Sequence, residues 1–261
     1  MTSRGNTADI NGARIYYEIF GSGPPLLMLH GGTESSRCWS AQIEFFSRRF
    51  KLILPDTRGH GRSTDTDQPF GYAQFASDMA ALLDHLRIKT AFLCGSSDGG
   101  IIGLHLGIHH PGRIERQILL GANYHVDGLL PEFRVWLRRM SRSEGSIKWT
   151  GDLIEEYKRL SPQGPDSWDR FLKKVLALWS SEPDYTEAEI ASIEIPTLVI
   201  AGDRDPFVRL DHTTALFKRL PRGALCILPN GDHNISKNKA EQFNPISLEF
   251  FLREERLLDI L

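Results

Sequence analysis

The chain has 261 residues, of which 41% are hydrophobic, so it can bury one substantial core with a small insertion. Its 31 basic and 33 acidic residues are interspersed and give a formal net charge of −2, which argues against a nucleic-acid or anionic-membrane partner. The first residues lack the apolar run of a signal peptide and no stretch is long enough to span a bilayer, so we expect a cytoplasmic protein.

Alternating and apolar runs predict strands in the first quarter of the chain. Residues 14–20 alternate as an early strand, and the apolar runs 26–30 and 51–55 predict two buried strands. Each buried run leads into a glycine-containing turn, His30-Gly31-Gly32 after the first and Asp56-Thr57-Arg58-Gly59-His60-Gly61-Arg62-Ser63 after the second. A helix is predicted from about residue 72 to 86, because its apolar side chains share one stripe.

The most informative stretch is Gly95-Ser96-Ser97-Asp98-Gly99-Gly100. A short buried strand precedes it, and a helix is predicted from Asp98 to about His109. In this setting the Gly-x-Ser-x-Gly pattern predicts a sharp strand-to-helix turn with the Ser97 hydroxyl exposed. The two glycines are needed because strand and helix come too close there for a Cβ. The alternative, a glycine-rich turn with a bystander serine, fits this strand–turn–helix context less well.

A change of character follows the predicted strand at 114–120. From about residue 122 to 192 the sequence becomes helical and charged, and it holds four of the five tryptophans, namely Trp136, Trp149, Trp168 and Trp179. Aromatic side chains at helical spacing usually serve packing. We therefore expect each single tryptophan to pack, although the segment as a whole is positioned to shape an apolar substrate pocket.

Two further apolar runs, 197–201 and 225–228, predict buried strands that each lead into a polar loop. The first loop carries Asp203 and Asp205, and the second carries Asp232 and His233. Loops after neighbouring parallel strands meet at one sheet edge, so an acid and a histidine can reach Ser97 there. Serine is a weak nucleophile that needs a base, and the base needs a carboxylate to fix its tautomer.

Strands alternate with helices along most of the chain, which predicts an α/β fold with a mostly parallel central sheet flanked by helices. The last helix is predicted to begin at Asn244-Pro245, a capping residue followed by proline. Of the cysteines Cys38, Cys94 and Cys226, the last two lie on predicted strands and are interpreted as small core side chains. His105 and His109 share a helix face but lack the glutamate of His-Glu-x-x-His, so neither a metal nor another cofactor is expected.

Taken together, these motifs resemble the α/β-hydrolase superfamily over nearly the whole chain. The His30-Gly31 turn, the Asp56–Ser63 turn, the serine elbow and the two loops with acid and histidine occur in the family's order. The resemblance implies a core formed by residues 1–121 and 193–261, with residues 122–192 inserted as a helical cap. It also implies a catalytic serine, acid and histidine in that order, here with Ser97 and His233.

The resemblance favours one acid and places the oxyanion hole. In the family's Gly-x-x-Asp loop the last aspartate serves the triad, which favours Asp205, while Asp203 is expected to cap the turn. Asp232 is poorly placed to bond the ring of its own neighbour. One oxyanion donor is the backbone N–H of Asp98 after the nucleophile, and the resemblance places the second at Gly32.

Asp98 departs from many relatives, which carry an apolar residue after the nucleophile. A carboxylate there would repel an anionic acyl group and attract an ammonium, as in relatives with a Ser-Asp-Gly-Gly elbow that cleave amino-acid esters. This predicts neutral or amine-bearing substrates. The alternative is that Asp98 pairs with an arginine of the cap or caps the helix N-terminus.

We therefore expect a hydrolase that cleaves a carboxylic ester or lactone of a small molecule through an acyl-enzyme on Ser97. Amino-acid ester, amide or thioester hydrolysis is the nearer alternative. A binding protein or biosynthetic cyclase that keeps the pocket without hydrolysis is the alternative of another class, since function depends on the site and not on the fold. The sequence indicates neither the substrate nor the oligomeric state.

Overall fold

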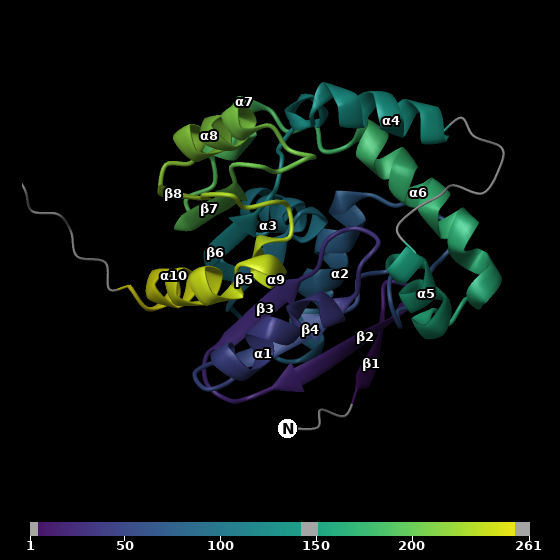
Figure 1. Cartoon of the computed structure of the whole chain (residues 1–261). Helices are drawn as coiled ribbons and strands as arrows, with labels where there is room; N and C mark the ends of the chain where they lie inside the picture. Colours follow the sequence, from purple (N-terminus) through teal and green to yellow (C-terminus); the bar gives the residue numbers. More distant parts are fainter. Residues whose placement is uncertain (1–4, 142–150, 254–261) are drawn as a thin grey trace, which may run out of the picture.

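The computed structural model describes residues 5–141 and 151–253, which are built around one eight-stranded sheet (Figure 1). The strands are β1 (Asn6–Ile10), β2 (Ala13–Phe20), β3 (Pro25–Leu29), β4 (Lys51–Pro55), β5 (Ala91–Ser96), β6 (Ile114–Leu120), β7 (Thr197–Gly202) and β8 (Gly223–Leu228). Their order is β1-β2-β4-β3-β5-β6-β7-β8, with β1 and β2 antiparallel to their neighbours and every other pair parallel. The predicted mostly parallel sheet is confirmed.

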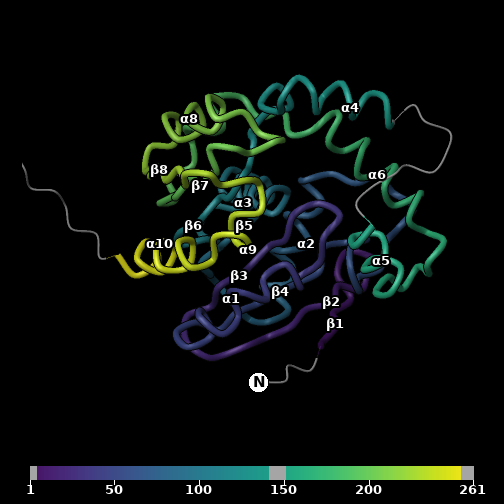
Figure 2. Tube along the Cα trace, viewed as in Figure 1, coloured from purple at the N-terminus to yellow at the C-terminus, as the bar shows by residue number. Residues whose placement is uncertain are grey.

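Helices cover both faces of the sheet, because its buried strands are apolar on both sides. In β3, Leu27 belongs to the core on one face and Leu26 to the core on the other. The first face packs against α2 (Tyr72–His85) and α3 (Asp98–His109), and the second against α1 (Ser40–Phe46) and α10 (Ala240–Leu252). The Cα trace shows the sheet held between these two layers (Figure 2). Helices α8 (Leu210–Arg219) and α9 (Ile235–Asn238) are the remaining α-helices that follow β7 and β8.

In the described part of the chain, four more α-helices lie between β6 and β7 in the sequence. They are α4 (Pro131–Ser141), α5 (Gly151–Leu160), α6 (Trp168–Ser181) and α7 (Glu187–Ala191). Helix α4 packs against α6, and together with α5 they lie beside the sheet rather than on either face (Figure 1). Trp168 is buried as expected, whereas Trp149 lies outside the described residues.

The prediction for the last helix was wrong. Helix α10 begins at Ala240, so Pro245 lies inside it and Asn244 does not cap it. Asn244 instead accepts a hydrogen bond from Gln42 Nε2 (2.9 Å), which ties α10 to α1. A tertiary contact thus explains an asparagine that resembled a cap.

Two smaller differences occur at the sheet edges. Strand β1 was not predicted, because only Ala8 and Ile10 of its five residues are buried. Cys94 is buried as expected, but Cys226 is only half-buried because β8 forms the opposite edge. Within the described ranges, no helix combines the length and apolar character needed to cross a bilayer.

Candidate active site

Ser97 occupies a strained turn between β5 and α3. Its φ is 51° and its ψ −116°, in the left-handed region that is unfavourable for residues other than glycine. A Cβ at Gly95 would lie 2.2 Å from the Gly99 carbonyl oxygen, and a Cβ at Gly99 would lie 2.2 Å from that of Leu29. Both glycines are therefore required by close backbone approach, and the turn leaves Ser97 partly exposed.

His233 and Asp205 form a hydrogen-bonded pair at the same sheet edge. His233 lies in the loop after β8 and Asp205 in the loop after β7, and Nδ1 of His233 is 2.7 Å from Oδ2 of Asp205. The other carboxylate oxygen of Asp205 accepts the N–H groups of Phe207 (2.8 Å) and Val208 (3.1 Å). Those bonds fix the carboxylate, so its free oxygen orients the ring.

The pKa of His233 reflects opposing effects. Burial lowers it, but the negative charge of Asp205 and the hydrogen bond to it raise it, as do the charges of Glu34 and Asp98. The net pKa of His233 lies above the ordinary value of 6.5. Neighbouring carboxylates thus stabilise the protonated ring. This is the form that a histidine adopts when it accepts a proton as a general base.

The two other aspartates near His233 serve the backbone. Asp203 accepts the N–H of Gly231 (3.3 Å) and joins the two loops. Asp232 accepts the N–H of Asn234 and the amide of Asn238, both at 2.8 Å. Of the three carboxylates, the structure brings Asp205 to the ring.

The turn after β3 places Gly32 beside the elbow. Thr57 N–H donates to Nε2 of His30 (3.0 Å), so the ring carries its proton on Nδ1, which lies 2.7 Å from the Gly31 carbonyl oxygen. The N–H of Gly31 donates to Glu34 (3.2 Å). In the described part of the chain, neither the N–H of Gly32 nor that of Asp98 has an internal hydrogen-bond acceptor, so both can serve a ligand.

A cavity of about 400 Å³ joins these groups. Ser97, His233, Gly32 and Asp98 line one side, at the carboxyl ends of the parallel strands. The four-helix segment and the loop after β7 complete the lining with Leu129, Phe133, Leu153, Trp179, Phe207 and Val208. Trp179 therefore lines a cavity, whereas each single tryptophan was expected to pack, and the neighbouring Phe133 lines the same cavity.

The Asp98 side chain has two partners that the sequence did not indicate. Trp179 Nε1 donates to both carboxylate oxygens (2.9 and 3.0 Å) and Tyr72 Oη donates to Oδ1 (3.1 Å). Burial raises the pKa of Asp98, and the hydrogen bonds from Trp179 and Tyr72 lower it, with a net increase. The alternative pairing with an arginine was wrong for the described residues, because Asp98 is in no ion pair with one.

Sequence reasoning missed two further features of the site. Gly121, directly after β6, has a φ of 59°, and a Cβ there would lie 2.9 Å from Cε1 of His233. Its position directly after a buried strand is the signal that could have found it. Glu34 forms an ion pair with Lys237 at the cavity wall, and these residues are 203 positions apart, so no local pattern predicts the pair.

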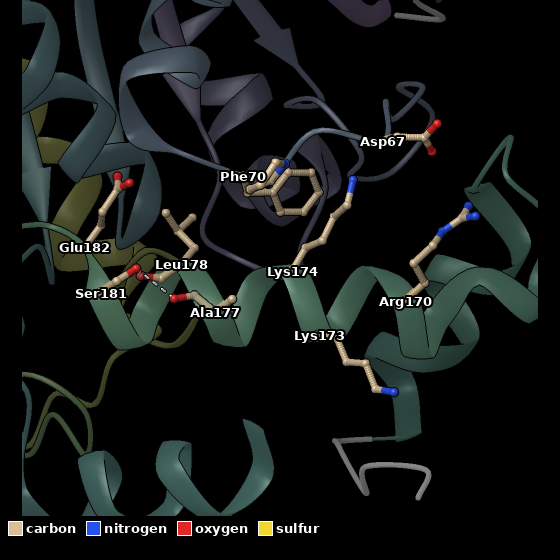
Figure 3. Close-up of a pocket in the computed structure, with 10 residues that line it drawn as sticks. Asp67, Phe70, Arg170, Lys173, Lys174, Ala177, Leu178, Ser181 and Glu182 are labelled. Atoms are coloured by element: carbon tan, nitrogen blue, oxygen red, sulfur yellow. Dashed lines mark hydrogen bonds between the residues drawn. The ribbon is translucent and has the colours of Figure 1, made fainter. Parts of the chain in front are cut away.

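A second cavity, of about 710 Å³, lies along α6 on the side of residues 67–70 (Figure 3). Lys174 points towards Phe70 there, and its ammonium pairs with Asp65 (2.8 Å). Glu182, at the end of α6, lines both cavities. None of Ser97, His233 and Asp205 lines the second cavity, which separates it from the candidate chemistry.

The two histidines that share a face of α3 lie close together. The rings of His105 and His109 are 4.2 Å apart, and Nδ1 of His105 is 2.9 Å from the hydroxyl of Tyr185. Among residues 5–141 and 151–253, no three histidine, cysteine or acidic side chains gather in a way that could hold a metal ion.

Comparison with known proteins places this geometry in a family. The model of the α/β hydrolase fold family matches residues 24–240. The chain belongs to the α/β-hydrolase fold family. The match includes the elbow, the turn after β3 and both loops that carry Asp205 and His233, so the chain is a hydrolase.

Relatives of several activities resemble this α/β hydrolase. The serine hydrolase BPHL of Mus musculus is 26% identical over 92% of this chain and 84% of that protein. The 3-oxoadipate enol-lactonase 2 of Acinetobacter baylyi is 27% identical over 87% of this chain and 89% of that protein. The crystal structure of the enol-lactonase from Burkholderia xenovorans LB400 superposes with a TM-score of 0.78 at 25% identity, covering 95% of this chain and all of that one (100%).

Proposed function

We propose that this α/β hydrolase cleaves a carboxylic ester or lactone of a small molecule through an acyl-enzyme on Ser97. The observation that carries the proposal is the 2.7 Å pair of His233 and Asp205 at the cavity that Ser97 also lines. Nucleophile, base and orienting acid from three separate loops are what acyl transfer by serine requires. The similarity to two enol-lactonases and a serine hydrolase supports the same reaction class.

The proposed reaction follows from the roles of these groups. His233 takes the proton of Ser97 as Oγ attacks the substrate carbonyl carbon, and Asp205 stabilises the imidazolium that forms. The N–H groups of Gly32 and Asp98 bind the oxyanion, each contributing about 3 kcal/mol to transition-state stability. His233 then protonates the departing alkoxide, and water repeats these steps to release the acid and regenerate Ser97. In a lactone the alkoxide stays attached, so one hydroxy acid is the product.

We also propose that residues 122–192 act as a cap on a core of residues 1–121 and 193–261. Support comes from Phe133 of α4 and Trp179 of α6, which line the cavity that Ser97 and His233 also line. Substrate selection would then depend on the cap, while the chemistry depends on the core.

A fluorophosphonate probe followed by intact-mass measurement tests the proposal. One adduct is expected on the wild type and none on Ser97→Ala. Ser96→Ala is the matched control, since Ser96 lines the same cavity and its variant should still be labelled. An ester and lactone panel on the unlabelled wild type then separates the two substrate classes from amides and thioesters. A folded wild type that takes no adduct would contradict the proposal and favour a binding protein that does not hydrolyse.

A second candidate is the hydrolysis of amino-acid esters. The Asp98 carboxylate lines the cavity, and its three hydrogen bonds leave one of about four lone-pair positions open on Oδ2. A substrate ammonium could take that position.

A further inference from the structure

The nucleophile elbow is held by donors from two different parts of the chain. Asp98 follows the nucleophile, and only 6% of it is exposed. Its carboxylate receives the phenol of Tyr72, the first residue of α2, and the indole N–H of Trp179 near the end of α6. A buried carboxylate without a cation needs such donors, because an unsatisfied buried charge is costly. The position of α6 is therefore coupled to the elbow.

The same indole also touches the second proposed oxyanion residue. A Cβ at Gly32 would lie 2.4 Å from Cζ2 of Trp179 and 2.6 Å from Oδ2 of Asp98. The Trp179 ring and the Asp98 carboxylate thus lie directly against the Gly32 Cα. One side chain of α6 contacts both residues whose N–H groups are proposed to bind the oxyanion.

A further contact fixes the end of α6 to the start of α2. Glu182 follows Trp179 by three residues and accepts the backbone N–H of Tyr72 (2.9 Å). Figure 3 shows Glu182 at this end of α6, on the side of the helix towards which Lys174 also points. Tyr72 therefore uses its N–H for Glu182 and its hydroxyl for Asp98. These bonds form one connected set between α6, α2 and the elbow.

We infer that Trp179 is a positioning residue that sets the geometry of the oxyanion hole through its hydrogen bonds to Asp98 and its contact with Gly32. The inference rests on the proposed function. Oxyanion donors act only when they are preorganised, and small misplacements cost much of the rate. When α6 is docked, both donors are held in place. Without Trp179, Asp98 would lose two of its three hydrogen bonds and Gly32 would lose its packing.

The test compares two tryptophans of the same helix. Trp179→Phe keeps a ring against Gly32 and removes the donor to Asp98. Trp168→Phe is the matched control, because Nε1 of Trp168 has no hydrogen-bond partner among the described residues and Trp168 does not line the active-site cavity. We expect Trp179→Phe to lower kcat about tenfold or more, within the ~100-fold that follows the loss of one oxyanion donor. Trp168→Phe should leave kcat within about twofold, since it removes no hydrogen bond.

A boronic acid inhibitor separates positioning from substrate contact. Its tetrahedral adduct on Ser97 uses the oxyanion donors, so its Ki should rise in Trp179→Phe by the same factor as kcat falls. KM should change little. Tyr72→Phe removes the other donor to Asp98 and should show a smaller effect of the same kind, which keeps the test valid if Trp179→Phe unfolds.

Two results would overturn the inference. If Trp179→Phe raises KM but leaves kcat and the boronate Ki unchanged, Trp179 is only a wall of the pocket. If Trp168→Phe loses as much kcat as Trp179→Phe, the effect comes from the packing of α6. Failure of the proposed function is distinguishable, because the wild type itself would then neither turn over esters nor take the fluorophosphonate.

Discussion

Gly121 lies directly against the ring of His233. A Cβ at this position would be 2.9 Å from Cε1 of His233, 3.0 Å from Nδ1 and 3.4 Å from Oδ2 of Asp205. Because Gly121 also has a φ of 59°, a side chain there would be both strained and in the way of the pair. The end of β6 thus leaves room for the pair that the loops after β7 and β8 bring together.

Gly121→Ala should therefore lower kcat strongly, because the added methyl displaces His233 from Asp205. A control for strain alone is Gly112→Ala, where φ is 82° and no atom lies within 4 Å of an added Cβ. Both variants should lose about 1–2 kcal/mol of stability from the left-handed backbone, measured by urea unfolding. Steady-state kinetics should show the loss of kcat in Gly121→Ala alone. Equal kcat in the two variants would contradict a role for Gly121 in the site.

The pH dependence of activity should follow His233. A general base must be neutral to accept a proton, so kcat/KM should rise with pH through the pKa of His233, which lies above 6.5. Asp205→Asn removes the neighbouring charge, so this limb should move to lower pH. The plateau should fall by about 10⁴, because an amide facing Nδ1 favours the wrong tautomer. A pH–rate profile of both proteins measures the two effects, and an unmoved limb in Asp205→Asn would exclude His233 as the titrating group.

Much of the fold could be predicted because a buried parallel strand can be recognised from its own few residues. The strands predicted at 51–55 and 114–120 coincide with β4 and β6, in each of which the last four residues are buried. Strand β1 has too few buried residues for such a pattern. The start of α10 was mispredicted because Asn244 bonds to Gln42, a residue 202 positions away, and local capping rules do not include such contacts.

The site likewise has residues that a local motif predicts and residues that only the folded chain brings together. Ser97 and its glycines form a local motif, because the strand-to-helix turn needs them within five residues. Trp179 and Tyr72 reach Asp98 from 81 and 26 residues away, and Gly121 meets His233 only in the folded chain. Those contacts depend on how separate elements pack together at the sheet edge, which periodicity does not encode.

A buried ion pair should stabilise the turn after β4. Arg58 donates to both carboxylate oxygens of Asp78 at 2.8 Å, and their side chains are 5% and 0% exposed. Arg58→Ala would leave the Asp78 charge buried and should cost about 3–5 kcal/mol of stability. Arg48→Ala breaks an exposed pair with Glu44 and should cost less than about 1 kcal/mol. Urea unfolding of both variants checks this, and similar losses would show that burial does not set the strength of the pair.

The charge of Asp98 should govern any preference for amine-bearing substrates. An ammonium about 4 Å from a carboxylate gains up to about 4 kcal/mol at a partly buried site. We therefore compare kcat/KM for an α-amino ester with kcat/KM for its analogue without the amino group. Asp98→Asn should lower this ratio by about tenfold or more. The ratio matters because any disturbance of the oxyanion hole affects both esters alike. Since the pKa of Asp98 is raised, the wild-type preference should also weaken as the pH falls and the carboxylate is protonated. A ratio that Asp98→Asn leaves unchanged would end the amine hypothesis and leave the carboxylate with its structural role towards Trp179 and Tyr72.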